Sequence, residues 1–293
     1  MPSSRRKVLH KKQLIEFLRY CRYAKLMSQR SDSPAQRIAD FGLSVIEVIT
    51  FVGHAVRLIL QSFHLLVRGP SIGQPVRLRH VVQEIITGGV QSLPVVVLMA
   101  STIGVMLSIQ GIHSLQIFGA ETQVSFGLAL SIPREFAPLI TGIIVAGRSG
   151  SQLASRVGSM RLNGEIDALI VMGISPIRFI VAPALLGLLI SLPILVAVAT
   201  VASLTAGQLY IEATIGIASQ AFWADVLSVV TMVDLAHCFG KSVLFALLIA
   251  LIGIVMGLGV SGGAEVLGRA TTSSVVTCIG AIIAADTAVA LLL

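Results

Sequence analysis

Three long stretches of the chain are apolar and carry no charge. No Asp, Glu, Lys or Arg occurs in residues 85–120, 179–211 or 242–264. A helix of about 20 apolar residues is long enough to cross the hydrocarbon core of a bilayer. The apolar positions are continuous, as in "LPVVVLMASTIGVML" (93–107), and do not alternate as in a membrane barrel strand. We therefore predict an all-α polytopic membrane protein, because a helix satisfies its own backbone hydrogen bonds in lipid.

The apolar pattern predicts five transmembrane helices and one helix at the membrane surface. Pro183 and Pro193 are expected to kink the third span. Residues 41–67 are apolar but carry polar side chains at helical spacing, which is typical of an amphipathic helix lying in the interface. The predicted organisation is a basic arm at 1–40 and a membrane domain at 41–293, with spans at about 92–118, 134–158, 177–204, 235–260 and 272–293.

Positive charge is concentrated near the N-terminal end of the chain. Fourteen of the 21 Lys and Arg residues lie before residue 80, although charged residues make up only 12% of the chain. Because cytoplasmic segments are enriched in Lys and Arg, we expect this arm in the cytoplasm, close to anionic lipid. The connection at 205–234 contains neither residue and is expected to face outward. No nucleic-acid partner is expected without an accompanying fold, and an organelle transit peptide is the alternative for the arm.

Small residues follow one face of the second predicted span. Gly142, Ala146, Gly150, Ala154 and Gly158 recur every four residues, so helical geometry places them on one side. In lipid, such stripes allow two helices to approach closely, because packing drives their association. We therefore predict that another helix packs against this face.

Arg148 lies near the middle of the same span. A charge inside the membrane costs about 2.5–3.5 kcal/mol on insertion scales, so a partner or a watery cavity is expected. The candidate partners are Glu135, Glu121 and Asp286. We take Glu135, Arg148 and Asp286 as candidate functional polar residues within the membrane, in either a structural ion pair or a substrate path.

The segment after the second span predicts a short helix at 164–172. Asn163 is a suitable N-terminal cap, and Glu165 and Asp167 lie in the first turn, where the helix dipole favours carboxylates. The apolar face consists of Ile166, Leu169 and Ile170, while Gly173 and Pro176 are typical of a helix end. Such a helix on the cytoplasmic side is shaped to dock into a groove of another protein. A plain connecting turn is the alternative.

The stretch "PREFAPLITGIIVAGRSGSQLASRVGSMRLNGEIDALIVMGISPI" (133–177) resembles the signature of the MlaE-type ABC permease family. Further similarity extends over 85–293, in "SLPVVVLMASTIGVMLSIQ", "FGAE", "KSVLFALLIALIG" and "GRATTSSVV". The matching positions are Arg134, Glu135, Pro138, Thr141, Ala146, Gly147, Arg148, Gly150, Ser151, Gly158, Met160, Glu165, Ile166, Asp167, Ala168, Leu169, Met172, Gly173 and Pro176.

The resemblance implies a homodimeric permease in the bacterial inner membrane that moves phospholipids or related lipids. It implies a separate cytoplasmic ABC ATPase subunit and a periplasmic lipid-binding partner with an MCE domain. The short helix would then be the coupling helix moved by the ATPase, through Glu165, Ile166, Asp167, Leu169, Met172 and Gly173. The sequence contains no G-x-x-x-x-G-K-[ST] loop, so ATP hydrolysis is expected of the partner and not of this chain.

Two other functional classes are alternatives for this sequence. Residues 147–150 fit the G-x-S-G motif of intramembrane serine proteases, with Ser149 as nucleophile and His237 as a conceivable base. A secondary transporter independent of ATP is the other class, although the halves of the chain show no repeat. For the lipid path, the candidates are Gln110, His113 and Glu121 near the outer end. We expect no cofactor and no metal site.

Overall fold

The computed structural model describes residues 78–174 and 176–292. Every element in these ranges is helical, and five helices are long and apolar enough to cross a membrane. The predicted all-α polytopic fold with five spans is therefore confirmed. The predicted basic arm at 1–40 and interfacial helix at 41–67 lie outside the described residues. The candidate spans are Arg79–Gln116, Glu121–Leu162, Phe179–Ile215, Met232–Leu258 and Ala264–Leu291.

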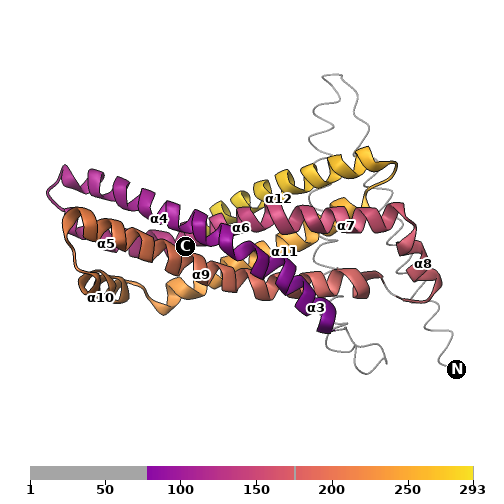
Figure 1. Cartoon of the computed structure of the whole chain (residues 1–293), viewed down its shortest axis with the longest axis horizontal. Helices are drawn as coiled ribbons and strands as arrows, with labels where there is room; N and C mark the ends of the chain where they lie inside the picture. Colours follow the sequence, from indigo (N-terminus) through magenta and orange to yellow (C-terminus); the bar gives the residue numbers. More distant parts are fainter. Residues whose placement is uncertain (1–77, 175, 293) are drawn as a thin grey trace, which may run out of the picture. The chain divides into compact units, whose positions relative to one another are not determined.

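Several spans consist of successive helical segments (Figure 1). Two shorter helices connect the second span to the third and the third to the fourth. The α-helices are α3 (Leu78–Glu84), α4 (Leu93–Gln116), α5 (Val124–Ser131), α6 (Ala137–Val145), α7 (Ser151–Leu162), α8 (Glu165–Val171), α9 (Ala182–Ile215), α10 (Ser219–Val229), α11 (Met232–Leu258) and α12 (Ala264–Leu292).

Short stretches of wider or tighter helix separate the α-helical segments within the first three spans. The wider π-helical turns insert one residue into the α-helix, and such insertions occur frequently at functional sites. In the second span, two of them flank α6 and contain Arg134, Glu135 and Arg148, three charged residues of the predicted signature. The π-helical segments are η2 (Ile85–Gly89), η5 (Ile132–Phe136), η6 (Ala146–Gly150) and η7 (Ile177–Val181), and the 3₁₀ segments are η3 (Val90–Ser92) and η4 (Glu121–Gln123).

The helices of the first three spans are longer than the sequence predicted. The second begins at Glu121 and not near residue 134, because the charges that suggested a boundary there are paired with other helices. The third continues to Ile215, since the first break in its sequence is Gly216 with φ of +79°. Part of the expected outer connection at 205–234 is therefore helical, and α10 occupies much of the remainder and packs against α5.

The chain divides into two compact units. The larger consists of Arg77–Gln152, Pro183–Ile252 and Ser274–Leu293. Within it, α4 and α9 lie so close that a Cβ atom added to Gly104 would lie 2.0 Å from the main-chain oxygen of Ser203. The Ser203 hydroxyl donates to the main-chain oxygen of Ala100 at 2.9 Å. Small residues therefore hold this pair of helices in close contact.

The described part of the smaller unit consists of Leu153–Ala182 and Gly253–Ser273. Within this unit, α7 packs against the end of α11 through two glycines. A Cβ atom added to Gly257 would lie 2.8 Å from the main-chain oxygen of Ala154, and one added to Gly158 would lie 2.5 Å from the side chain of Leu267. The helix ends in this unit therefore approach each other closely.

The small-residue face of the second span packs against other helices, as predicted. In the larger unit, a Cβ atom added to Gly142 would lie 3.0 Å from Phe245 of α11, and one added to Gly150 would lie 3.4 Å from Cys278 of α12. Ala146 is fully buried. The stripe is therefore a packing face, and its glycines leave room for side chains from α11 and α12.

Candidate functional site

A buried lysine joins three helical segments of the larger unit. Lys241 lies on α11, and its side chain is only 1% exposed. Its ammonium nitrogen lies 2.7 Å from Oε2 of Glu135 in η5 and 2.9 Å from Oδ1 of Asp286 in α12. The contact with Glu135 is a hydrogen bond, whereas the contact with Asp286 is an ion pair without hydrogen-bond alignment. Lys241 also donates to the main-chain oxygen of Arg134 at 3.1 Å. The ammonium is therefore surrounded by acceptors, as a buried charge requires.

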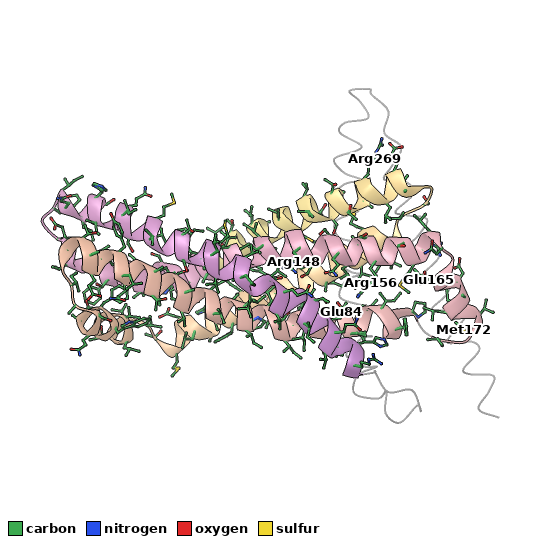
Figure 2. The ribbon with its side chains drawn as sticks, in the orientation of Figure 1. Glu84, Arg148, Arg156, Glu165, Met172 and Arg269 are labelled. Atoms are coloured by element: carbon green, nitrogen blue, oxygen red, sulfur yellow. The ribbon has the colours of Figure 1, made fainter. Side chains whose placement is uncertain are left out.

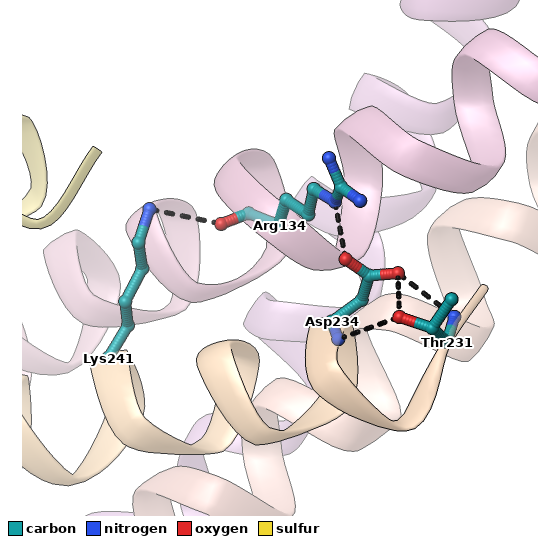
Figure 3. Close-up of polar contacts among 4 residues, drawn as sticks. All are labelled: Arg134, Thr231, Asp234 and Lys241. Atoms are coloured by element: carbon teal, nitrogen blue, oxygen red, sulfur yellow. Dashed lines mark hydrogen bonds and ion pairs between the residues drawn. The ribbon is translucent and has the colours of Figure 1, made fainter. Parts of the chain in front are cut away.

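An arginine on the same π-helical segment pairs with the start of α11 (Figure 3). Nε of Arg134 donates to Oδ1 of Asp234 at 2.6 Å, and the Asp234 side chain is only 4% exposed. Oδ2 of the same carboxylate accepts from the main-chain nitrogen of Thr231 at 2.9 Å and from its hydroxyl at 2.8 Å. Both carboxylate oxygens are therefore engaged, each by a different element.

These residues form one site that is buried at one side and open at the other. We call Arg134, Glu135, Asp234, Lys241 and Asp286 the charged cluster. Lys241 and Asp234 are buried, whereas the side chains of Arg134 and Glu135 are 49% and 42% exposed. The cluster contains two cations and three carboxylates. It can tie three helices together through the buried groups while presenting a guanidinium and a carboxylate at the surface.

Sequence reasoning identified part of this cluster. Glu135 and Asp286 were predicted as functional polar residues, and the structure brings them together through Lys241, which was missed. Lys241 precedes the charge-free stretch 242–264, and an isolated charge within a span is itself a signal of function. Asp234 was missed as well, although Thr231 three residues earlier gives the pattern of a helix capping box.

Arg148 has different partners from those expected. Its guanidinium donates to the main-chain oxygen of Gln91 and, at 3.1 Å, to the side-chain oxygen of the same residue. The expected pairing with Glu121, Glu135 or Asp286 is wrong, because among the described residues Gln91 supplies both acceptors and Lys241 holds Glu135 and Asp286. Gln91 lies in the 3₁₀ segment η3, where the regular α-helical pattern is interrupted. Arg148 thus joins the irregular segment η3 of the first span to η6 of the second.

The predicted docking segment is a helix, α8, with one buried and one exposed face. Ile166 is fully buried and Leu169 nearly so. The exposed side carries Glu165 and Asp167, followed by Val171 at 87% exposure and Met172 just after the last turn. Figure 2 labels Glu165 and Met172 at the two ends of this short helix. Side chains on the exposed face are therefore available to another protein.

The caps of α8 match the prediction at one end only. Gly173 adopts φ of +75°, and the nitrogen of Ile174 donates back to the oxygen of Leu169 at 2.9 Å, which closes the helix as expected. The expected cap by Asn163 is wrong. The chain leaves α7 through Gly164 at φ of +72°, which occupies the cap position without a side-chain bond, while Asn163 donates to Glu165 Oε1 at 3.2 Å. The helix consequently spans seven residues, fewer than the nine expected.

The residues predicted for the lipid path make no described contact with the charged cluster. Gln110 and His113 are exposed on α4, and Glu121 is half-buried at the first position of η4. No hydrogen bond or ion pair joins them to the cluster within the described part of the chain. Their assignment to a lipid path stays a prediction.

The protease alternative finds no support in the geometry. Ser149 is buried, and its hydroxyl donates to the main-chain oxygen of Gly88 at 3.4 Å. No hydrogen bond joins Ser149 to His237 among the residues described here, so the motif lacks the base that a serine nucleophile requires. Over the same residues, no group of three or more His, Cys, Asp or Glu side chains is arranged to hold a metal ion.

Comparisons with known proteins agree with the resemblance seen in the sequence. The family described as "Permease MlaE" matches residues 81–292. A probable ABC transporter permease protein of Synechocystis is 31% identical over 204 residues, which cover 70% of this chain and 78% of the relative. The intermembrane phospholipid transport system permease protein MlaE of Haemophilus influenzae is 31% identical over 243 residues, covering 82% and 90%. The chloroplastic protein TRIGALACTOSYLDIACYLGLYCEROL 1 of Arabidopsis thaliana is 30% identical over 208 residues, covering 71% and 59%.

Proposed function

Because this chain belongs to the MlaE permease family, we propose that it moves phospholipids as the membrane subunit of an ABC transporter in the bacterial inner membrane. The chain is a multi-pass permease, and the relative from Haemophilus influenzae is described as an intermembrane phospholipid transport permease. The five spans supply an extensive apolar surface for acyl chains, with Leu98, Met106 and Ile194 among the exposed side chains.

The observation that carries the lipid assignment is the half-exposed guanidinium of Arg134 within a membrane span. Its Nε group is bound to Asp234, so the two terminal amino groups remain available to an anionic partner. Arginine binds phosphate strongly, because its planar fork of donors matches the phosphate oxygens. We therefore assign Arg134 as the contact for the phosphate of the lipid headgroup, with Glu135 and Lys241 fixing the segment on which it lies.

A separate cytoplasmic ATPase would supply the energy through α8. The support is the two-sided character of this helix, whose Ile166 and Leu169 are buried while Glu165, Asp167 and Val171 face outward. Because one face of α8 is buried, displacement of this helix by the ATPase would also move the spans that it connects. The exposed carboxylates and the apolar end would contact the ATPase, as the family resemblance implies.

The remaining partners follow from the family and from one surface feature. A second copy of the chain would pack on α12, where Gly280 and Ala284 are exposed and a Cβ atom added to Gly280 would meet no atom within 4 Å among the described residues. A periplasmic protein with an MCE domain would exchange lipid with the permease at its outer end.

Affinity purification of the tagged chain from native membranes tests this function. We expect an ABC ATPase and bound phospholipid to co-purify, and we expect the pair of changes Glu165→Lys and Asp167→Lys to abolish recovery of the ATPase. The control is Glu265→Lys, an exposed carboxylate in the same unit, which should leave recovery unchanged. Absence of any ATPase with the unmodified chain would contradict the transport proposal. Full recovery with the double variant would contradict the docking role of α8 alone.

A further inference from the structure

We propose that Asp234 is a positioning residue for lipid recognition: with Thr231 it forms a helix cap that aims the guanidinium of Arg134 at the phosphate. The inference rests on the proposed contact between Arg134 and the headgroup. It assigns a role to the start of α11, a region that the sequence signature does not include. Among the described residues, Arg134 is the only cation in contact with this carboxylate.

The carboxylate of Asp234 is fixed by its own helix. The main-chain nitrogen of Asp234 donates to the Thr231 hydroxyl at 3.3 Å, and the main-chain nitrogen of Thr231 donates to Oδ2 of Asp234 at 2.9 Å. These reciprocal bonds are those of a capping box, in which the cap residue and the residue three positions later satisfy each other's main-chain donors. The Thr231 hydroxyl also donates to Oδ2 at 2.8 Å. One carboxylate oxygen is thus held entirely by the helix start.

The other oxygen of the carboxylate determines how Arg134 is presented. Oδ1 accepts from Nε at 2.6 Å, and Nε is the donor nearest the side-chain stem. In Figure 3, the dashed line to Asp234 starts at Nε, and none starts at either terminal nitrogen of Arg134. A carboxylate that bound both terminal nitrogens would occupy the donors that a phosphate needs. The bond through Nε instead restrains the plane of the guanidinium and leaves its outer edge open.

A purely structural role for Asp234 predicts a different result from a positioning role. As a cap alone, Asp234 would stabilise α11 whether or not Arg134 is present. As a positioning residue, it would change phosphate recognition only while Arg134 is present. The two roles are separated by non-additivity, because residues that act through one another do not contribute independently.

The experiment measures binding of two fluorescent probes to the purified full chain in detergent micelles. The probes are phosphatidylglycerol and a diacylglycerol with the same acyl chains, which lacks the phosphate. The readout is the ratio of their affinities, which reports the phosphate contact separately from acyl-chain binding. Variants are Arg134→Ala, Asp234→Asn, the double variant, and Asp225→Asn on α10 as a matched change of carboxylate to amide.

We expect Arg134→Ala to lower the preference for the phospholipid about tenfold, as loss of charge-assisted hydrogen bonds implies. Asp234→Asn should lower it about fivefold in the unmodified chain and less than about twofold in the Arg134→Ala background, given that the two residues act together. Asp225→Asn should leave the preference unchanged. A second pair of variants keeps the test independent of folding defects. Thr231→Ser keeps the hydroxyl and should keep the preference for the phospholipid. Thr231→Val removes the hydroxyl and should lower this preference, while the charge of Asp234 stays in place.

Two results would overturn the inference in distinguishable ways. If Arg134→Ala lowers the preference but Asp234→Asn does not, or if Asp234→Asn has the same effect in both backgrounds, Asp234 does not position Arg134. The proposed headgroup contact would survive that result. If Arg134→Ala leaves the preference unchanged, both the headgroup contact and the role of Asp234 are wrong.

Discussion

Replacing Lys241 with methionine tests whether the charged cluster holds the spans together. Methionine has a similar length and is apolar, so the change removes the ammonium without opening a large cavity. Removing one partner of a buried ion pair costs about 3–5 kcal/mol, because the other charge is left uncompensated. Here the exposure of the two carboxylates decides the magnitude. Glu135 is 42% exposed and can be solvated, whereas Asp286 is 12% exposed and cannot. We expect a loss near the lower limit, about 3 kcal/mol.

The assay is reversible unfolding of the purified chain in mixed micelles, followed by helical circular dichroism as the denaturing detergent is increased. Asp286→Asn in the Lys241→Met background removes the stranded charge. The double variant should therefore be more stable than the sum of the single changes predicts, by about 2 kcal/mol. The control is Arg269→Met, which breaks the ion pair between Arg269 and Glu265. Both of these side chains are 79% exposed. An exposed pair of this kind contributes less than about 0.5 kcal/mol.

Two outcomes would refute the reasoning about this cluster. The first is a loss for Lys241→Met no larger than that for Arg269→Met, which would mean that the buried ammonium does not stabilise the fold. The second is a double variant whose loss equals the sum of the single losses. In that case Lys241 and Asp286 do not interact energetically, despite the 2.9 Å between their charged atoms.

Three further predictions concern packing and helix geometry. Gly104→Ala should destabilise the chain by several kcal/mol or prevent its folding, because the added Cβ would overlap the main chain of α9. Gly127→Ala on α5, where the added Cβ would meet no atom within 4 Å among the described residues, should be neutral in the same detergent unfolding assay. Arg148→Ala should lower the free energy of unfolding by about 2 kcal/mol, because its charge-assisted hydrogen bonds to Gln91 are lost. Gln91→Ala should cost less in the same unfolding measurement in micelles, because it keeps the main-chain acceptor. Gly173→Ala should cost about 1–2 kcal/mol from the left-handed backbone at the end of α8, and should weaken ATPase recovery in the purification assay.

The fold was predictable because its main constraint is local. A continuous apolar stretch in lipid must be helical, and this rule identified all five spans. The span ends were less predictable, since a charge marks a boundary only if it faces water. Arg134 and Glu135 suggested a boundary, yet both are paired with residues about a hundred positions later in the chain. Tertiary pairing of this kind leaves no trace in the local pattern.

The candidate site was predicted in part for the same reason. Glu135 and Asp286 were recognised because a charge in an apolar segment is conspicuous. The ion-pair partner of Glu135 and of Asp286 could not be predicted, because the chain contains several cations and only the packing of the helices determines which one lies close. Arg148 illustrates the limit. Its partner is the neutral Gln91, whose acceptor oxygen is presented by an irregular turn that no propensity rule specified.

We propose that ATP hydrolysis by a partner drives phospholipid through this permease. The most direct measurement uses proteoliposomes that contain the permease together with its co-purified ATPase and fluorescent phosphatidylglycerol. Loss of the probe from the vesicle membrane to a soluble acceptor protein, or its gain from a loaded one, is followed with and without ATP. The account predicts a rate that depends on ATP, disappears without the ATPase and falls about tenfold with Arg134→Ala, as expected for lost charge-assisted bonds. A rate that is the same without ATP, or without the ATPase, would contradict it.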